Sequence, residues 1–178
     1  FDDVIIGAFR ADPGGNDSGA AYLVFGAAGG FDPTLDLGDL DGTDGFRLDG
    51  VAAGDWTGYS VSGIGDFNGD GYDDLLVAAY NADPGGRANA GSTYVVFGKE
   101  AGFGATLDLG TLDGDSGFRL DGDFAGDEQG VSVRGAGDVN DDGYDDIIVG
   151  ATEADYNGGF SGAAYVIFGT PAGIPLTL

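Results

Sequence analysis

The residues of this chain with the clearest chemistry form two short acidic stretches with the same spacing. One, at residues 65–74, reads "GDFNGDGYDD", and the other, at residues 137–146, reads "GDVNDDGYDD". Two unit charges about 4 Å apart repel by on the order of 4 kcal/mol at an effective dielectric constant of about 20. A compact loop this rich in carboxylates therefore predicts a bound cation.

The spacing of the oxygen atoms indicates which cation. Counting from the first Asp of each stretch, side-chain oxygens fall at positions 1, 3, 5 and 9, Gly stands at position 6, and a main-chain carbonyl is available at position 7. Hard oxygen ligands in a flexible loop suit Ca²⁺, which takes about six to eight of them. The predicted ligands of two complete calcium sites, with each Tyr contributing its carbonyl, are Asp66, Asn68, Asp70, Tyr72 and Asp74, and Asp138, Asn140, Asp142, Tyr144 and Asp146.

Two other interpretations of these stretches are weaker. An EF-hand loop begins in the same way but needs a bidentate Glu at position 12 and flanking helices; here position 12 is Val77 in one stretch and Val149 in the other. A plain turn rich in Asp and Asn is the second alternative, since these residues favour turns. The recurrence of the same ligand spacing argues against it.

Some neighbouring acidic residues are not assigned as ligands. Asp73 and Asp145 lie between ligand positions, and we expect them to be solvated or hydrogen-bonding carboxylates at the start of a strand. Asp2 and Asp3 match the end of the acidic stretch, but no residues that match the earlier ligands precede them. The sequence therefore predicts no complete site at the N-terminus.

The composition excludes several functions. The chain has 31 acidic and 6 basic residues, a net charge of −25, and neither Cys nor His. The electrostatic field of so acidic a chain repels nucleic acid. Without His or Cys the chain can form no His-dependent catalytic triad, no thiolate metal site and no disulfide. We predict that the chain is not an enzyme. No apolar run reaches the roughly 20 residues that would span a bilayer, so we expect no direct membrane insertion.

Internal repetition indicates the elements that carry the two stretches. The segment at 34–50, "TLDLGDLDGTDGFRLDG", returns at 106–122 as "TLDLGTLDGDSGFRLDG". The segment "AYLVFG" at 21–26 returns at 93–98 and 164–169, and "VIIGA" at 4–8 returns at 75–79 and 147–151, so the period is 71 to 72 residues. Short β-branched runs bounded by Gly, Asp and Asn predict strands. We expect four in the central unit, at 59–65, 74–80, 92–98 and 117–122, with the acidic stretch joining the first two.

Repeated four-stranded antiparallel units predict an all-β fold of β-propeller type, with about two and a half blades in one repeat domain. Residues 1–50 would form a partial blade that lacks its first strand, residues 51–122 a complete blade, and residues 123–178 a partial blade that lacks its last strand. Because a repeat array exposes apolar faces at its ends, we expect further blades of the same or another chain as partners. The chain contains no Met, so we expect it to be a piece of a longer polypeptide.

The acidic loop between two strands, followed by "LLVAA" or "IIVGA" and then by "YVVFG" or "YVIFG", resembles the FG-GAP repeats of the integrin α β-propeller. Similar repeats occur in secreted bacterial calcium-binding and adhesion proteins. The resemblance covers nearly the whole chain and implies calcium ligands at the ten positions given above. The chain departs from the family pattern where "GAP" reads "GAF", "AAY" or "GAT", and where no Phe precedes Gly58 and Gly130. No residue that binds an integrin ligand is carried over.

These observations together predict a calcium-binding propeller segment of an extracellular, bacterial adhesion or cell-surface protein. Ca²⁺ would stabilise the loops between strands, and the partner would be a protein or carbohydrate ligand on a surface. Two alternatives stay open at this point. The chain could be a non-catalytic accessory propeller of a secreted hydrolase, or a structural element that assembles with copies of itself.

Overall fold

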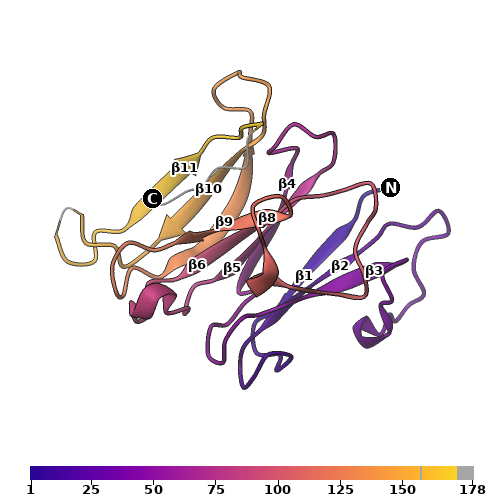
Figure 1. The fold of residues 1–178 in the computed structure, drawn as a ribbon, viewed down its shortest axis with the longest axis horizontal. Helices are drawn as coiled ribbons and strands as arrows, with labels where there is room; N and C mark the ends of the chain where they lie inside the picture. The colour runs from indigo at the N-terminus through magenta and orange to yellow at the C-terminus, as the bar shows by residue number, and fades with distance from the viewer. Residues whose placement is uncertain (157, 172–178) are drawn as a thin grey trace.

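Three β-sheets form the body of the molecule (Figure 1). The computed structural model describes residues 1–156 and 158–171. Within these residues the strands are β1 (Val4–Ala8), β2 (Ala20–Val24), β3 (Gly45–Asp49), β4 (Ser60–Gly65), β5 (Asp74–Ala79), β6 (Ser92–Val96), β7 (Thr106–Asp108), β8 (Gly117–Asp121), β9 (Gln129–Gly137), β10 (Asp146–Ala151) and β11 (Ala163–Ile167). The single-turn 3-10 helices are η1 (Leu37–Asp39), η2 (Pro84–Gly86) and η3 (Leu109–Thr111). No helix in the described part of the chain has the length and apolarity needed to cross a membrane.

The strand order repeats from sheet to sheet. The first sheet is ordered β1-β2-β3-β7, the second β4-β5-β6-β8, and the third β11-β10-β9. Within each sheet the first three strands in chain order pair antiparallel with their neighbours, for example Val77 of β5 opposite Tyr94 of β6. The all-β architecture of propeller type predicted from the sequence is confirmed. The limits assigned to the three blades stay a prediction.

The small strand β7 was not predicted. It lies in the connection between β6 and β8 of the second sheet, yet it pairs parallel with β3 of the first sheet, Arg47 opposite Thr106 and Asp49 opposite Asp108. The amide of Arg47 donates to the carbonyl of Ala105 at 3.0 Å. Three residues are too few to show a period-two pattern, so this strand is specified by its partner and not by its own sequence.

Two apolar layers separate the three sheets. Leu23, Phe46, Leu48, Val77 and Tyr94 belong to the layer between the first and second sheets. The layer between the second and third sheets contains Leu76, Val95, Phe118, Leu120, Val149 and Ile167. Because successive side chains of β5 enter opposite layers, both faces of this central strand are buried, which explains its continuous apolar run.

Glycine is needed where neighbouring sheets approach most closely. A Cβ atom on Gly7 would lie 1.9 Å from the carbonyl oxygen of Gly58, and one on Gly91 would lie 2.1 Å from the carbonyl oxygen of Gln129. These backbone contacts bring one sheet against the next at the end opposite to the acidic loops. The recurrence of Gly in the repeat therefore reflects packing between sheets.

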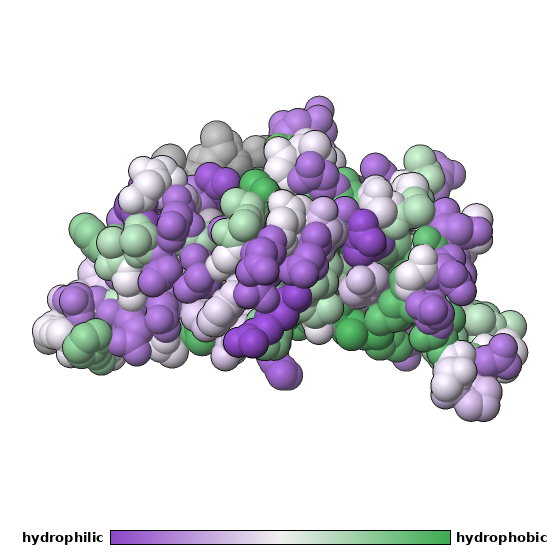
Figure 2. Space-filling view, turned by 90° about the horizontal axis from the view of Figure 1, so that it is seen from below, coloured by the Kyte–Doolittle hydropathy of each residue, from purple (hydrophilic) through white to green (hydrophobic). Residues whose placement is uncertain are grey.

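The surface of the molecule is uneven. Figure 2 shows that hydrophilic residues cover much of the face seen from below, and that the largest hydrophobic area lies to the right of the view, where Figure 1 places the first sheet. Val4 at the start of β1 is 45% exposed, and Ile148 and Val166 of the third sheet are 38% and 48% exposed. The two outer sheets thus present apolar side chains to solvent, as an open stack of sheets must.

Candidate metal centres

Both acidic stretches are hairpin connections between the first two strands of their sheets. Residues 66–73 join β4 to β5, and residues 138–145 join β9 to β10. The two loops lie at the same end of the molecule, at the top of Figure 1. Each loop is flanked by an antiparallel strand pair, β4 with β5 or β9 with β10, which fixes the two ends of the loop.

Side chains at the predicted ligand positions curl the first loop. The Asp66 carboxylate accepts hydrogen bonds from the amides of Asp70 at 3.0 Å and Gly71 at 2.9 Å. Asn68 Oδ1 accepts from the amide of Asp70 at 3.0 Å, and Asp70 Oδ1 accepts from the amide of Tyr72 at 2.9 Å. These are Asx-type turns, in which a side-chain oxygen holds a backbone amide two or more residues further along.

The second loop has the same geometry. Asp138 accepts from the amides of Asp142 at 3.0 Å and Gly143 at 2.8 Å, and Asn140 Oδ1 accepts from Asp142 at 3.0 Å. The hydrogen bonds within the loop lower the pKa of Asp138, led by the one from Gly143. Both loops use a left-handed residue at position 4, Gly69 with φ 75° and Asp141 with φ 62°. The shared spacing therefore produces one shared conformation, despite this difference in sequence.

The ninth position of each loop is a buried carboxylate. Asp74 and Asp146 are fully buried. Asp74 Oδ2 accepts from the amide of Phe67 at 3.0 Å, and Asp74 Oδ1 accepts from the amide of Gly98 at 2.8 Å. Asp146 repeats both bonds, with Val139 at 2.9 Å and Gly169 at 2.9 Å. Each of these side chains ties the start of its loop to the end of the third strand of its sheet.

The charged groups that shift the pKa of Asp74 most strongly are acidic. Burial raises the pKa of Asp74 to about 7, the backbone hydrogen bonds oppose this shift, and the negative charges of Asp70 and Asp66 add to it. A carboxylate removed from water among like charges is stabilised when a cation joins it. The electrostatics of the first loop thus suit a metal ion.

The loop carboxylates also keep lone pairs that a metal ion could use. A carboxylate has about four lone-pair sites, and the hydrogen bonds described above use two on Asp66 and two on Asp74. In the described ranges, however, no three Asp, Glu, His or Cys side chains are arranged as a preformed metal site. The loop carboxylates instead accept hydrogen bonds from backbone amides of the same loop. Binding of an ion would require these side chains to rotate toward a common point.

One functional contact was not assigned from the sequence. Asp145 Oδ2 accepts a hydrogen bond from the amide of Asp66 at 2.9 Å, and the amide of Asp145 donates back to the carbonyl of Asp66 at 3.2 Å. Of the two expectations for Asp145, the structure thus shows the hydrogen-bonding one, and it shows that the bond crosses between sheets. The two loops are therefore coupled directly, and the repeated first Asp of each "YDD" segment was the only sequence signal for this contact.

Comparison with known proteins gives a consistent result. The model of the FG-GAP repeat matches residues 57–96 and 130–167, each of which contains one acidic loop and the strands around it. Human integrin alpha-IIb is 37% identical over 95 residues, covering 53% of this chain and 8% of that protein. Integrin alpha-PS2 of Drosophila melanogaster is 33% identical over 132 residues, covering 72% of this chain and 9% of that protein. The chain thus spans less than a tenth of the length of these relatives.

Proposed function

Because the chain belongs to the FG-GAP repeat family, we propose that it is a calcium-binding segment of an extracellular adhesion or cell-surface protein. The observation that carries this proposal is the identical hydrogen-bonded conformation of two acidic loops with the same five-oxygen spacing. The extracellular setting is inferred from the similarity to integrin α subunits. The role is non-catalytic, and the partner is a protein or carbohydrate surface ligand.

The bound ion would act as a staple within each hairpin. Asp66, Asn68 and Asp70 would supply side-chain oxygens from the loop, Tyr72 its carbonyl, and Asp74 the oxygen closest to the sheet. The ion would supply positive charge where the loop has none of its own. Since Asp74 already joins the loop to the end of β6, fixing its carboxylate would also fix the start of β5 against its neighbours. The second loop would work in the same way around Asp146.

Calcium titration of the whole chain tests this proposal. We expect Ca²⁺ to raise Tm relative to a sample treated with a chelator. Extracellular calcium modules bind with dissociation constants of about 10⁻⁴ to 10⁻³ M, and a hundredfold excess over the dissociation constant stabilises the folded state by about 2.7 kcal/mol for each site. Equal Tm values with Ca²⁺ and with chelator would contradict the proposal.

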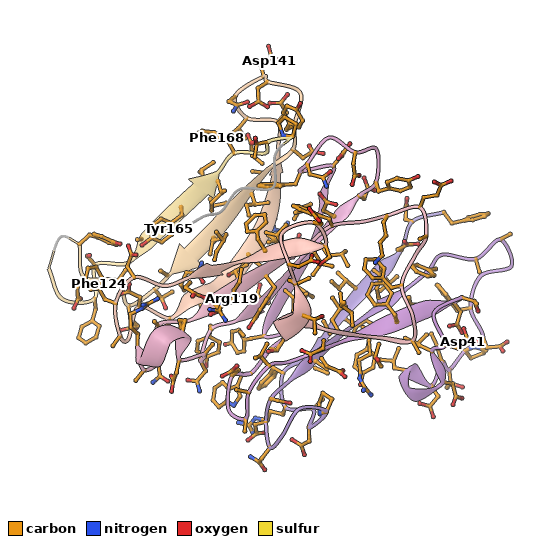
Figure 3. All side chains as sticks on the ribbon, in the orientation of Figure 1. Asp41, Arg119, Phe124, Asp141, Tyr165 and Phe168 are labelled. Atoms are coloured by element: carbon orange, nitrogen blue, oxygen red, sulfur yellow. The ribbon has the colours of Figure 1, made fainter. Side chains whose placement is uncertain are left out.

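The second loop offers a charge-matched pair of variants. Asp142→Asn removes one charge at a predicted ligand position, and Asp141→Asn removes one charge from the adjacent residue, whose side chain points away from the loop at its outer tip (Figure 3). We expect Asp142→Asn to abolish calorimetric binding at one of two sites, and Asp141→Asn to leave two sites with affinities changed by no more than about threefold. Equal effects of the two variants would indicate general charge attraction instead of a site.

A further inference from the structure

The contact between the two acidic loops is made at a predicted calcium ligand. Asp66, the first ligand position of the first loop, donates its amide to Asp145 Oδ2 at 2.9 Å and accepts from the amide of Asp145 at 3.2 Å. Asp145 stands between Tyr144 and Asp146, the seventh and ninth positions of the second loop. Both main-chain groups of a ligand in one loop are thus bonded to a residue that lies between two ligands of the other.

A second path joins the loops through the main chain of Phe67. The amide of Phe67 donates to Asp74 Oδ2 at 3.0 Å, and its carbonyl accepts from the amide of Thr170 at 3.0 Å. The preceding amide, that of Gly169, donates to Asp146 Oδ1 at 2.9 Å. Phe67 is 1% exposed and belongs to the apolar layer between the second and third sheets. The ninth positions of the two loops are therefore connected through a short run of buried main chain.

The ring of Tyr144 lies against the first loop. A Cβ atom on Gly69 would be 2.3 Å from Cε1 of this ring, so a larger residue fits there only if the ring moves. Gly69 and Asp141 take the same left-handed position in the two loops, with φ 75° and 62°. The backbone conformation alone does not demand Gly, since Asp adopts it in the second loop. The contact with Tyr144 accounts for the Gly in the first loop.

These contacts join groups that ion binding would reorganise. In both loops the carboxylate of the first Asp accepts hydrogen bonds from amides of its own loop. If the Tyr144 carbonyl and the Asp146 carboxylate converged on an ion, Asp145 would be fixed between them. Because Asp145 holds the amide and the carbonyl of Asp66, part of the entropy cost of ordering Asp66 would then be met before the first loop bound its own ion.

We propose that the two loops bind Ca²⁺ with positive cooperativity, and that Asp145 and the Tyr144 ring are the positioning residues that couple them. The proposal rests on the calcium binding proposed above and adds that the two sites are not independent. Charge alone predicts the opposite sign, because an ion in one loop weakens the negative field at the other. Positive cooperativity would therefore identify the contacts between the loops as its source.

Calcium titration followed by NMR at each site tests the coupling. The amides of Gly71 and Gly143 report the two loops, because each donates to the first Asp of its own loop. Asp142→Asn removes a predicted ligand of the second site. We expect it to raise the Ca²⁺ concentration at the Gly71 midpoint at least about twofold more than the charge-matched control Asp141→Asn does. Coupling between sites usually changes affinity by about fivefold or more, and between two equal sites the midpoint moves by about the square root of that factor.

The reverse experiment follows from the reciprocity of coupling. Asp70→Asn removes a predicted ligand of the first site and should move the Gly143 midpoint in the same direction, relative to Asp73→Asn at an exposed position outside the ligand set. The weaker site shows the larger shift when the two affinities differ. Saturation of both glycine amides with no shift in either direction would overturn the cooperativity and leave the calcium sites in place. No response of either amide to Ca²⁺ would overturn the proposed function as well.

Asp145→Ala shows whether the shift depends on the contact between the loops. In this variant the added Asp142→Asn change should move the Gly71 midpoint no further than Asp141→Asn does, because the bond that transmits the coupling is gone. Asp73→Ala, at the equivalent position of the preceding repeat, should keep the full shift. A full shift in Asp145→Ala would refute the assignment of this residue, since a merely structural loss would lower affinity without removing the dependence of one site on the other.

Gly69→Asn tests the ring contact separately. Asn accepts the left-handed conformation, so the first loop should still form and saturate with Ca²⁺. Its Cβ would displace the Tyr144 ring, and we expect the Gly71 shift caused by Asp142→Asn to become smaller than in the parent chain. An undiminished shift would exclude the ring as a positioning group.

Discussion

At the scale of single residues, aspartate side chains hold the backbone of the acidic loops. Asp66, Asp70, Asp74 and Asp145 all accept hydrogen bonds from backbone amides in the loop region. Their spacing along the chain predicted one loop conformation repeated twice. It did not predict the pairing of Asp66 with Asp145, because these residues are 79 positions apart and nothing in a local pattern specifies which sheet will lie beside which.

Asp145→Ala tests the coupling between the loops. The change leaves the amide of Asp66 without its acceptor in a partly buried place, which should lower the free energy of unfolding by about 1 to 3 kcal/mol. Asp73→Ala removes the equivalent exposed residue of the preceding repeat and serves as the control, with an expected change within about 0.5 kcal/mol. Urea unfolding of both variants at one calcium concentration provides the measurement. Equal losses would show that the bond to Asp66 is not the cause.

Tyr94 gives a dependence of stability on pH. It is 2% exposed, and burial raises its pKa to about 12, partly opposed by the Arg119 guanidinium. Since the ordinary pKa of tyrosine is about 10, folding favours the neutral phenol. The stabilisation is complete below pH of about 10 and is lost as the pH rises to about 12, by up to about 3 kcal/mol. Unfolding of Tyr94→Phe should lack this component, so parallel pH profiles for the two proteins would contradict the assignment.

At the scale of elements, the sequence predicted the strands of the central repeat closely. The expected strands at 59–65, 74–80, 92–98 and 117–122 correspond to β4, β5, β6 and β8, with ends that differ by no more than two residues. The side chains of these strands alternate or run continuously apolar, and Gly, Asp or Asn residues lie at or within two residues of their ends, so local signals were enough. β7 was not predicted, because only its pairing with the edge of β3 makes this segment a strand.

The connection that carries β7 contributes packing as well as hydrogen bonds. Phe103 stacks on Phe46 with ring centroids 4.4 Å apart, and Leu109 is 1% exposed in the layer between the first two sheets. In the first repeat Phe31, the counterpart of Phe103, is instead 51% exposed, and Leu37, the counterpart of Leu109, is only half-buried. Identical "TLDLG" segments therefore have different environments, and the difference arises from the presence of a neighbouring sheet edge in only one case.

Leu109→Ala and Leu37→Ala compare equivalent positions of the two segments with one kind of substitution. We expect Leu109→Ala to lower the free energy of unfolding by about 2 to 4 kcal/mol, because it opens a cavity between two sheets. Leu37→Ala should lower it by only about 1 kcal/mol, because this side chain is half-buried and leaves a smaller cavity. Chemical denaturation with constant m-values would confirm the comparison. Similar effects would show that the connection packs no better in the second repeat than in the first.

At the scale of the whole molecule, the sequence repeat predicted the class of fold. It did not predict the number of sheets in the assembly. The acidic loops occupy one end of the sheets, and the close glycine contacts such as Gly91 with Gln129 occupy the other. How many sheets complete the assembly depends on the accumulated rotation between neighbours, which no local sequence feature encodes. The chain's net charge of −25 makes cations a general requirement for close association of copies or further repeats.

The pairing of β7 with β3 also has a mechanical meaning. The connection leaves the second sheet after β6, adds a strand to the first sheet, and returns to form β8. The two sheets are thus joined by the covalent segment between β3 and β4 and also by a loop of one sheet inserted into the other. A pulling force that separates them must break the β3–β7 hydrogen bonds along with the apolar layer. The first two sheets therefore overlap through β7, and the β3–β7 pair would carry part of a tensile load between them.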